Sequence, residues 1–521
     1  MKRASFVIVA LTLAGTLAWI FAQAVATPRP LASLCPPGPL LYLEGKDFQA
    51  LLKDWNNSQE KRLWLESDNY EVFSRSNLYL KLQNAQTEFA AAAGIPPNMA
   101  LLDGVAGSES ALAFYDIGDL QFLFITRMPA AKLAESALWK VRGNYQPRKS
   151  AGLDYYVRID RATKRVAAFA AVQDYLLLAT REEALAGALA LLSGQSSPNV
   201  TQEPWYSKSV EAAKQAGELR LVLNMPRLLQ SPYMRSYWIQ RNASELKQFS
   251  AAISDVRRTG NHFDENRILF RSDDQPVTWN ESGVAQLAAL VPPNTGFYRA
   301  WASPTPTQAL DLLRARIFDP RAEASSNTKT APDAGSIDAT VGSESDLEIR
   351  IDEAPIDEKP AGNLPDEIRK LIDTQKLDGL LQVASTRVLS DGTFVGIDSA
   401  VVVLGSSNWS STAVNNVATS GKILVAATRP ELLELILART SQQPSGPGAR
   451  YAARFNHAAE LPNFIRMTRL IDSPLKADGP TFFSGNIASL GRTLGRLDSA
   501  NITVHDTGAV VTQQLTYRWK P

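Results

Sequence analysis

The order of hydrophobic and polar positions divides the chain into a short apolar leader and a long mixed region. No charged residue lies between Phe6 and Ala22, and two basic residues precede this stretch. A positive start, an apolar run and the small alanines that follow form the pattern of a signal peptide. The run also approaches the length of about 20 residues that spans a bilayer. We therefore expect residues 1–26 to act as a signal peptide or as a single transmembrane anchor, with residues 6–22 in the membrane.

Either outcome places the rest of the chain outside the cytoplasm. Basic residues ahead of an apolar segment stay on the cytoplasmic side, so the chain beyond the leader is exported. We expect it on the periplasmic or extracellular side of the membrane, anchored there or released by cleavage of the signal.

Beyond the leader, two distant segments share one pattern of strand, turn and helix. Residues 175–185 and 423–433 each combine an apolar strand, an Ala-Thr-Arg turn and a helix that opens with acidic residues. Thr180 and Thr428 occupy the positions where a hydroxyl can cap such a helix. Apolar residues then recur at helical spacing in both segments. This agreement indicates an internal repeat.

The match continues after this unit. Residues 219–224 and 451–456 are alternating strands that end in asparagine, and a helix follows each with a proline in its opening, Pro226 or Pro462. We then expect a helix in each half, over Ser244–Val256 and Phe482–Leu497.

Each half ends on a predicted hairpin, with turns at residues 264–266 and 506–508. The last strand alternates as a half-buried antiparallel strand does, with one face formed by Val511, Leu515, Tyr517 and Trp519. We therefore predict a tandem duplication with halves at 37–276 and 285–521. The alternative is two similar strand–helix units that arose by chance in one α+β chain.

The remaining elements favour the same fold class. Further strands are expected at 111–115, 122–127 and 399–404, and a helix over residues 78–93. Strands and helices without regular βαβ alternation are typical of the α+β class. We expect antiparallel sheets packed by amphipathic helices.

Residues 319–363 interrupt the second half. They are rich in Ala, Ser, Asp, Glu, Pro and Gly, and acidic residues exceed basic ones. Such a segment buries too little apolar surface to offset its ordering entropy. We expect a disordered acidic insertion that forms a solvated loop or, alternatively, binds a partner.

Length and charge limit the classes of function. At 521 residues the chain exceeds what one hydrophobic core usually supports, which favours two folded units. A net charge of +1 provides no long-range attraction for nucleic acid. We expect no nucleic-acid partner.

Cys35 is the single cysteine, which excludes an intramolecular disulfide and any site with several cysteine ligands. The segment that ends at Cys35 is similar to a lipobox in placing small residues before a cysteine. Leu34 stands where a lipobox has a small residue. We therefore expect an unmodified thiol.

Candidate catalytic groups are few. The three histidines are His262, His457 and His505, and Glu460 follows His457 at a spacing that places both on one helical face. We interpret that pair as surface charge and not as half of a metal site. The chain contains neither a His-Glu-x-x-His motif nor a phosphate-binding glycine loop.

Serine patterns are also weak. Penicillin-binding enzymes carry a Ser-x-x-Lys motif together with a Lys-Thr-Gly strand. This chain has the first motif but not the second. Ser-x-x-Lys occurs at Ser58, Ser244, Ser326 and Ser473. We predict no catalytic, cofactor-binding or metal-ligating residue, and no cofactor.

Residues 107–114, which read Gly-Ser-Glu-Ser-Ala-Leu-Ala-Phe, and residues 120–127 carry a family resemblance. With the leader, they resemble a loose group of uncharacterised bacterial envelope proteins over about residues 40–280. The resemblance implies an envelope location and assigns no activity.

Three functions follow as hypotheses. The first is a non-enzymatic envelope protein that binds another protein or an envelope component through its duplicated scaffold. The second is a carrier of a lipid or other apolar ligand, since curved sheets and amphipathic helices can enclose an apolar cavity. The third is an extracytoplasmic hydrolase, which would require convergent polar residues in one deep cleft.

Overall fold

The computed structural model describes most of the chain beyond the leader. The described residues are 29–520, except 67–69, 71–73, 76, 232–245, 274–278, 319–362, 413, 445–447 and 464–496. The predicted leader therefore lies outside the described residues, and so does the acidic insertion apart from residue 363. Among the described helices, none is both long enough and apolar enough to cross a bilayer.

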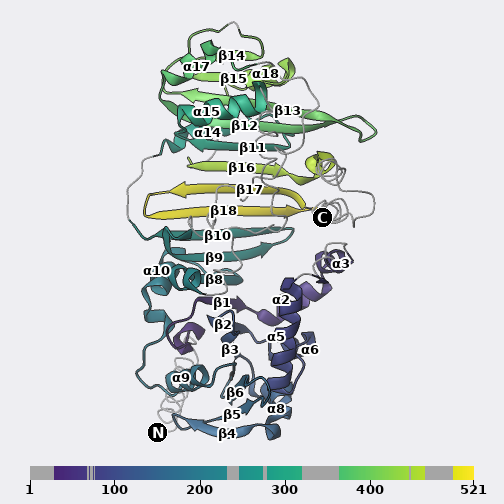
Figure 1. The fold of residues 1–521 in the computed structure, drawn as a ribbon, viewed down its shortest axis with the longest axis vertical. Helices are drawn as coiled ribbons and strands as arrows, with labels where there is room; N and C mark the ends of the chain where they lie inside the picture. The colour runs from purple at the N-terminus through teal and green to yellow at the C-terminus, as the bar shows by residue number, and fades with distance from the viewer. Residues whose placement is uncertain are drawn as a thin grey trace, which may run out of the picture.

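The described residues form one sheet of eighteen strands, and every strand pairing in it is antiparallel (Figure 1). The strands of its first part are β1 (Leu41–Lys46), β2 (Glu109–Asp116), β3 (Gln121–Arg127), β4 (Gln146–Ser150), β5 (Leu153–Ile159), β6 (Val166–Val172), β7 (Tyr175–Ala179), β8 (Leu219–Asn224), β9 (Phe249–Thr259) and β10 (His262–Arg271). Those of its second part are β11 (Phe297–Ala302), β12 (Leu377–Val388), β13 (Phe394–Gly405), β14 (Val417–Ser420), β15 (Ile423–Ala427), β16 (Tyr451–Asn456), β17 (Leu497–Asp506) and β18 (Val510–Trp519).

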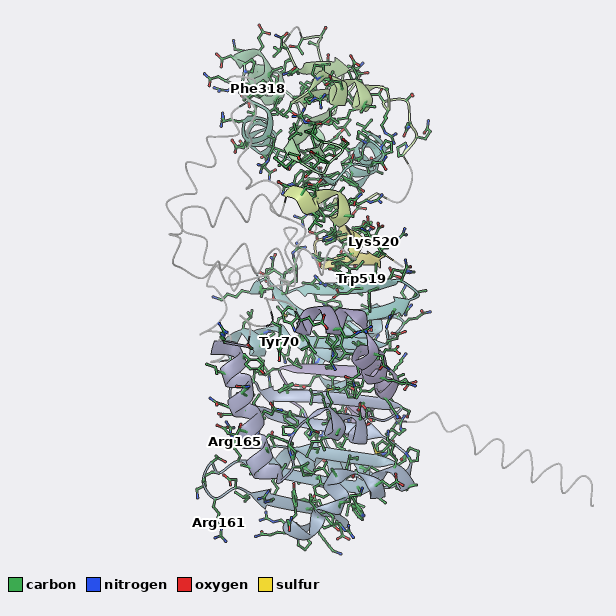
Figure 2. All side chains as sticks on the ribbon, turned by 90° about the vertical axis from the view of Figure 1, so that its right-hand side faces the viewer. Tyr70, Arg161, Arg165, Phe318, Trp519 and Lys520 are labelled. Atoms are coloured by element: carbon green, nitrogen blue, oxygen red, sulfur yellow. The ribbon has the colours of Figure 1, made fainter. Side chains whose placement is uncertain are left out.

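The strand pairings join the two parts in the middle of the sheet. The first part runs in the order β4-β5-β6-β7-β3-β2-β1-β8-β9-β10. The second runs in the order β18-β17-β16-β11-β12-β13-β15-β14. Strand β10 pairs with β18, so the strands continue from one part to the other along the long axis of the molecule (Figures 1 and 2).

Helices cover both faces of the first part. One face carries α5 (Asn77–Ala93), α6 (Met99–Val105), α7 (Ala130–Glu135) and α8 (Ala137–Lys140), and α2 (Phe48–Asn57) and α3 (Gln59–Leu65) follow β1. The opposite face carries the short turn η1 (Leu31–Leu34), α9 (Glu182–Leu192) and α10 (Pro204–Ala213). Because both faces are covered, all five residues of β7 are buried.

The second part is built in the same manner. One face is covered by α15 (Pro306–Leu313), the π-helical turn η4 (Arg314–Phe318) and α17 (Asp366–Asp373). The other is covered by α14 (Glu281–Ala289) and α18 (Pro430–Leu437). The short helix α11 (Met225–Gln230) follows β8.

The predicted α+β class is confirmed, and so are the antiparallel sheet and its amphipathic helices. Helix α5 confirms the helix expected over 78–93, and β8 and β16 have the predicted bounds. Three local expectations are wrong. Most of Ser244–Val256 is strand, because β9 begins at Phe249. The turn between β9 and β10 lies at residues 260–261, ahead of the predicted position at 264–266.

The third wrong expectation concerns Thr180 and Thr428. The N-cap residues of α9 and α18 are Arg181 and Arg429, and neither side chain caps its helix. Each threonine hydroxyl instead accepts a hydrogen bond from the backbone of a neighbouring strand. The two hydroxyls therefore fix the ends of strands and not the starts of helices.

Candidate functional site

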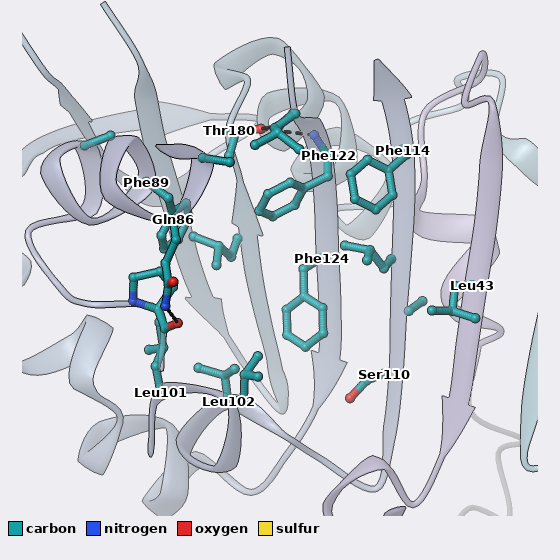
Figure 3. Close-up of a pocket in the computed structure, with 18 of the residues that line it drawn as sticks. Leu43, Gln86, Phe89, Leu101, Leu102, Ser110, Phe114, Phe122, Phe124 and Thr180 are labelled. Carbon is teal, nitrogen blue, oxygen red and sulfur yellow. Dashed lines mark hydrogen bonds between the residues drawn. The ribbon is translucent and has the colours of Figure 1, made fainter. Parts of the chain in front are cut away.

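A cavity of about 420 Å³ lies between the sheet and helices α5 and α6 of the first part (Figure 3). Its floor comes from β1, β2, β3, β6 and β7, and its helical wall from α5 and α6. Phe48 at the start of α2 and Leu219 of β8 line it as well.

The floor follows from the two-residue alternation of β2 and β3. Leu112 pairs with Phe124 and Phe114 pairs with Phe122, and all four residues line the cavity. Figure 3 shows the three phenylalanine rings. Residues between them, such as Leu123, are buried on the opposite face of the sheet. The four floor residues are only half-buried, because the helices do not close over them completely.

The wall is a stripe of small and aromatic residues on α5. Ala85, Phe89 and Ala92 line the cavity at helical spacing. The ring of Phe89 stacks on that of Phe122, with centroids 6.3 Å apart and planes 27° apart. Helix α6 supplies Leu101, whose backbone N–H donates to the capping side chain of Asn98 at 3.0 Å.

One end of the cavity is charged. Arg165 Nε donates to Glu88 Oε2 at 2.9 Å, and Arg165 Nη1 donates to the backbone oxygen of Asp119. These three residues line the cavity, and their pairing links α5 to the segment between β5 and β6 and to the turn between β2 and β3. Figure 2 labels Arg165 on the side of the molecule where the helical wall lies.

The hydroxyl groups of the lining already have partners. Thr180 Oγ1 accepts from the backbone N–H of Phe122 at 3.0 Å and donates to the backbone oxygen of Leu120 at 2.6 Å. Ser110 Oγ lies 2.7 Å from Thr126 Oγ1, and Ser110 is 4% exposed. The surface between these groups is aliphatic and aromatic, so the cavity offers mainly apolar contact.

The structure does not bring the three histidines to the cavity. His262 Nε2 lies 3.3 Å from Asp264 on β10, and His505 Nδ1 lies 3.5 Å from Glu281. His457 lies against Phe455, with ring centroids 4.4 Å apart. In the described part of the chain, no three His, Cys, Asp or Glu residues are grouped as metal ligands.

The interpretation of His457 and Glu460 as a surface pair is wrong. Glu460 is fully buried, where its Oε1 accepts from the backbone N–H of Thr386 at 3.0 Å and its Oε2 accepts from the Thr386 hydroxyl. Burial raises the pKa of Glu460, and the Thr386 hydrogen bonds partly oppose that shift. Its role is to tie the segment after β16 to β12.

The Ser-x-x-Lys serine that the structure describes is structural. Ser58 is the N-cap residue of α3, and its hydroxyl accepts a hydrogen bond from the backbone N–H of Lys61 at 3.1 Å. The other three serines lie outside the described residues; they are Ser244, Ser326 and Ser473. Cys35 is a free, buried thiol, and burial raises its pKa.

Known proteins resemble this chain only weakly. No family model matches the chain, and no curated protein matches it. Among solved structures, crystal forms IV, III and I of TP0453 are similar at 12%, 11% and 12% sequence identity, with TM-scores of 0.25, 0.26 and 0.25. The matches cover 47–48% of this chain and 81–82% of the TP0453 chain. We draw no conclusion about function from similarity at this level.

Proposed function

We propose that the protein binds an apolar, lipid-like molecule in the cavity between α5, α6 and the sheet. The observation that carries this proposal is a space of about 420 Å³ with a floor and wall of aromatic and aliphatic side chains. Binding clefts for small ligands have volumes of about 300–1,000 Å³ and mostly apolar linings. The cavity has both properties.

The same observation ranks the three hypotheses. A carrier of an apolar ligand uses the cavity directly, whereas docking of another protein does not require it. A hydrolase needs an activated nucleophile, yet the hydroxyls of Ser110 and Thr180 bond to a threonine and to the backbone. We therefore favour the carrier over both alternatives.

The sequence of the leader bears on where binding takes place. We propose that binding takes place on the periplasmic or extracellular side of the membrane, because the sequence of residues 1–26 has the pattern of an export signal or anchor. This location agrees with the resemblance to uncharacterised bacterial envelope proteins. A ligand with low solubility in water also needs a carrier in an aqueous compartment.

We further propose that residues 37–276 and 285–521 are tandem repeats. The strand order β10-β9-β8-β1-β2-β3-β7-β6 of the first part corresponds, strand by strand, to β18-β17-β16-β11-β12-β13-β15-β14 of the second. The hairpin β4–β5 is an addition to the first part. Chance similarity of single strand–helix units does not explain agreement over eight strands.

Local details support the duplication. Thr180 Oγ1 accepts the backbone N–H of Phe122 at 3.0 Å, and Thr428 Oγ1 accepts that of Ser399 at 2.9 Å. The hairpins β9–β10 and β17–β18 both shift register at their open ends.

The backbone after the first strand of each part also agrees. Asp47 follows β1 with φ 46°, and Ser303 follows β11 with φ 48°, so both residues adopt the left-handed conformation. A non-glycine residue rarely adopts that conformation.

The two repeats differ where the cavity lies. Leu43 pairs with Leu112 on the cavity floor, and the corresponding pair in the second part is Arg299 with Gln382. Arg299 Nε donates to Gln382 Oε1 at 2.8 Å, and its guanidinium lies 4.8 Å from the ring centroid of Trp301. A buried polar pair occupies this place in the second repeat, so we assign ligand binding to the first.

The test is to fill the cavity. Ala85→Phe places a ring in the cavity, whereas the control Ala91→Phe places the same ring on the exposed side of the same helix. We expect Ala85→Phe to weaken binding of an environment-sensitive naphthylamine dye to the full-length protein by about tenfold or more, and the control to leave binding unchanged. Equal dye binding by both variants, with thermal unfolding showing both folded, would refute the proposed function.

A further inference from the structure

The charged end of the cavity selects among apolar ligands. We infer that the ligand is a single-chain amphiphile with an uncharged head group that carries hydroxyl or ester groups, held by Arg165 and Glu88. This inference rests on the proposed function and adds the chemical class of the ligand.

The ion pair leaves one donor group and one acceptor available. Arg165 uses Nε for Glu88 Oε2 and Nη1 for the backbone oxygen of Asp119. Among the described residues, Arg165 Nη2 and Glu88 Oε1 have no hydrogen-bond partner. The side chains are 33% and 39% exposed, so a bound molecule can reach both. A hydroxyl group can donate to Glu88 and accept from Arg165 without breaking the pair.

The charges at this end oppose an anionic head. Glu88 and Asp119 are carboxylates, whereas Arg165 is the single cation in the lining. A fatty-acid carboxylate would bring a third negative charge to an arginine that is already paired. A cationic head can bind Glu88, but it would lie beside the Arg165 guanidinium, whose repulsion opposes that attraction, and it would offer Nη2 no acceptor. An uncharged head with a hydroxyl group can donate to Glu88 and accept from Nη2 without a contact between like charges.

The rest of the cavity fits the tail. Glu88 precedes Phe89, which stacks on Phe122, so the charged end lies at the Phe122 end of the floor. Figure 3 shows Ser110 at the opposite end, beyond Phe124. The Ser110 hydroxyl is already paired there, so that end provides no free group for a head. The apolar tail of a ligand whose head group lies at Glu88 therefore extends over Phe122 and Phe124.

The experiment compares ligands with the same tail. The full-length protein is titrated with monolauroyl glycerol, dodecanol, laurate and dodecylamine at neutral pH, by displacement of the naphthylamine dye. We expect monolauroyl glycerol and dodecanol to bind about tenfold more tightly than laurate and dodecylamine. Laurate or dodecylamine binding as tightly as the uncharged ligands would overturn the head-group inference and leave the proposed function in place. Failure of the dye itself to bind would instead refute the proposed function.

Two variants test the charge argument. Glu88→Gln removes one carboxylate and frees Arg165, so we expect laurate binding to increase about tenfold and the preference for uncharged heads to shrink. The control is Glu183→Gln on α9, an exposed carboxylate outside the cavity, and it should leave all affinities unchanged. Unchanged laurate binding in Glu88→Gln would overturn the assigned role of Glu88, with thermal unfolding of both variants as the check on folding.

Discussion

Arg220 and Asp255 form a buried ion pair with two parallel hydrogen bonds between β8 and β9. The distance from Arg220 Nε to Asp255 Oδ1 is 2.8 Å, and that from Nη2 to Oδ2 is 2.9 Å. The two side chains are 9% and 5% exposed. The backbone N–H of Gly217 also donates to Asp255 Oδ1 at 2.8 Å. Asp255 therefore holds a strand, a loop and a buried cation together.

Asp255→Ala leaves Arg220 buried without its counter-ion. We expect the free energy of unfolding to fall by about 3 kcal/mol or more, because an unpaired buried charge is costly. Urea unfolding measures this loss. The control is Asp154→Ala, which removes the exposed pair with Lys149 and should cost less than about 1 kcal/mol. Equal losses in the two variants would contradict the structural role of Asp255.

Thr180→Val and Thr428→Val should destabilise the protein by similar amounts. Each change leaves a backbone N–H without its acceptor, in Phe122 or in Ser399, at a cost of about 1–3 kcal/mol. Valine keeps the shape of threonine, so packing is little disturbed. Thr374→Val, at an exposed helix end, serves as the control. A large loss for one threonine and none for the other would argue against equivalent positions in two repeats.

Gly107 lies two residues before β2, and the structure explains the glycine there. A Cβ atom at this position would lie 2.0 Å from the backbone oxygen of Arg127 and 2.5 Å from Thr126 Oγ1. We expect Gly107→Ala to lower the free energy of unfolding by about 1–3 kcal/mol, because β2 and β3 must separate. Gly104→Ala on α6 is the matched control, since nothing lies within 4 Å of its Cβ position. Similar urea midpoints for both variants would contradict this account.

Strands could be predicted from the sequence where apolar and polar residues alternate, because such a strand has one apolar face and one polar face. Residues 219–224 and 451–456 alternate, and both form strands with the predicted bounds. The segment around β9 was wrongly predicted as a helix because it is apolar on both faces. Ala251 and Ile253 pack in one core, and Phe249 and Ala252 pack in another. Such a run has no two-residue alternation and imitates helical spacing.

The cavity itself could not be predicted from the sequence. Phe114, Phe122 and Phe124 form the same pattern whether a helix packs closely against them or stands away from them. Whether a cavity forms depends on the distance between α5 and the sheet. That distance is set by tertiary packing and not by the local sequence pattern. Glu88 and Arg165 are 77 residues apart, so no spacing signal marks them as partners.

Stability should fall in mild acid because of His457. Burial lowers the pKa of His457 to about 4, whereas an unperturbed histidine has a pKa of about 6.5. Between these values the unfolded chain binds a proton that the native protein does not, so the free energy of unfolding falls as the pH falls from 6.5 to 4. The loss from this residue has an upper bound of about 3 kcal/mol. His457→Gln should flatten the pH dependence of urea unfolding in this window, since glutamine does not titrate. Identical slopes in the two proteins would show that folding does not change the pKa of His457.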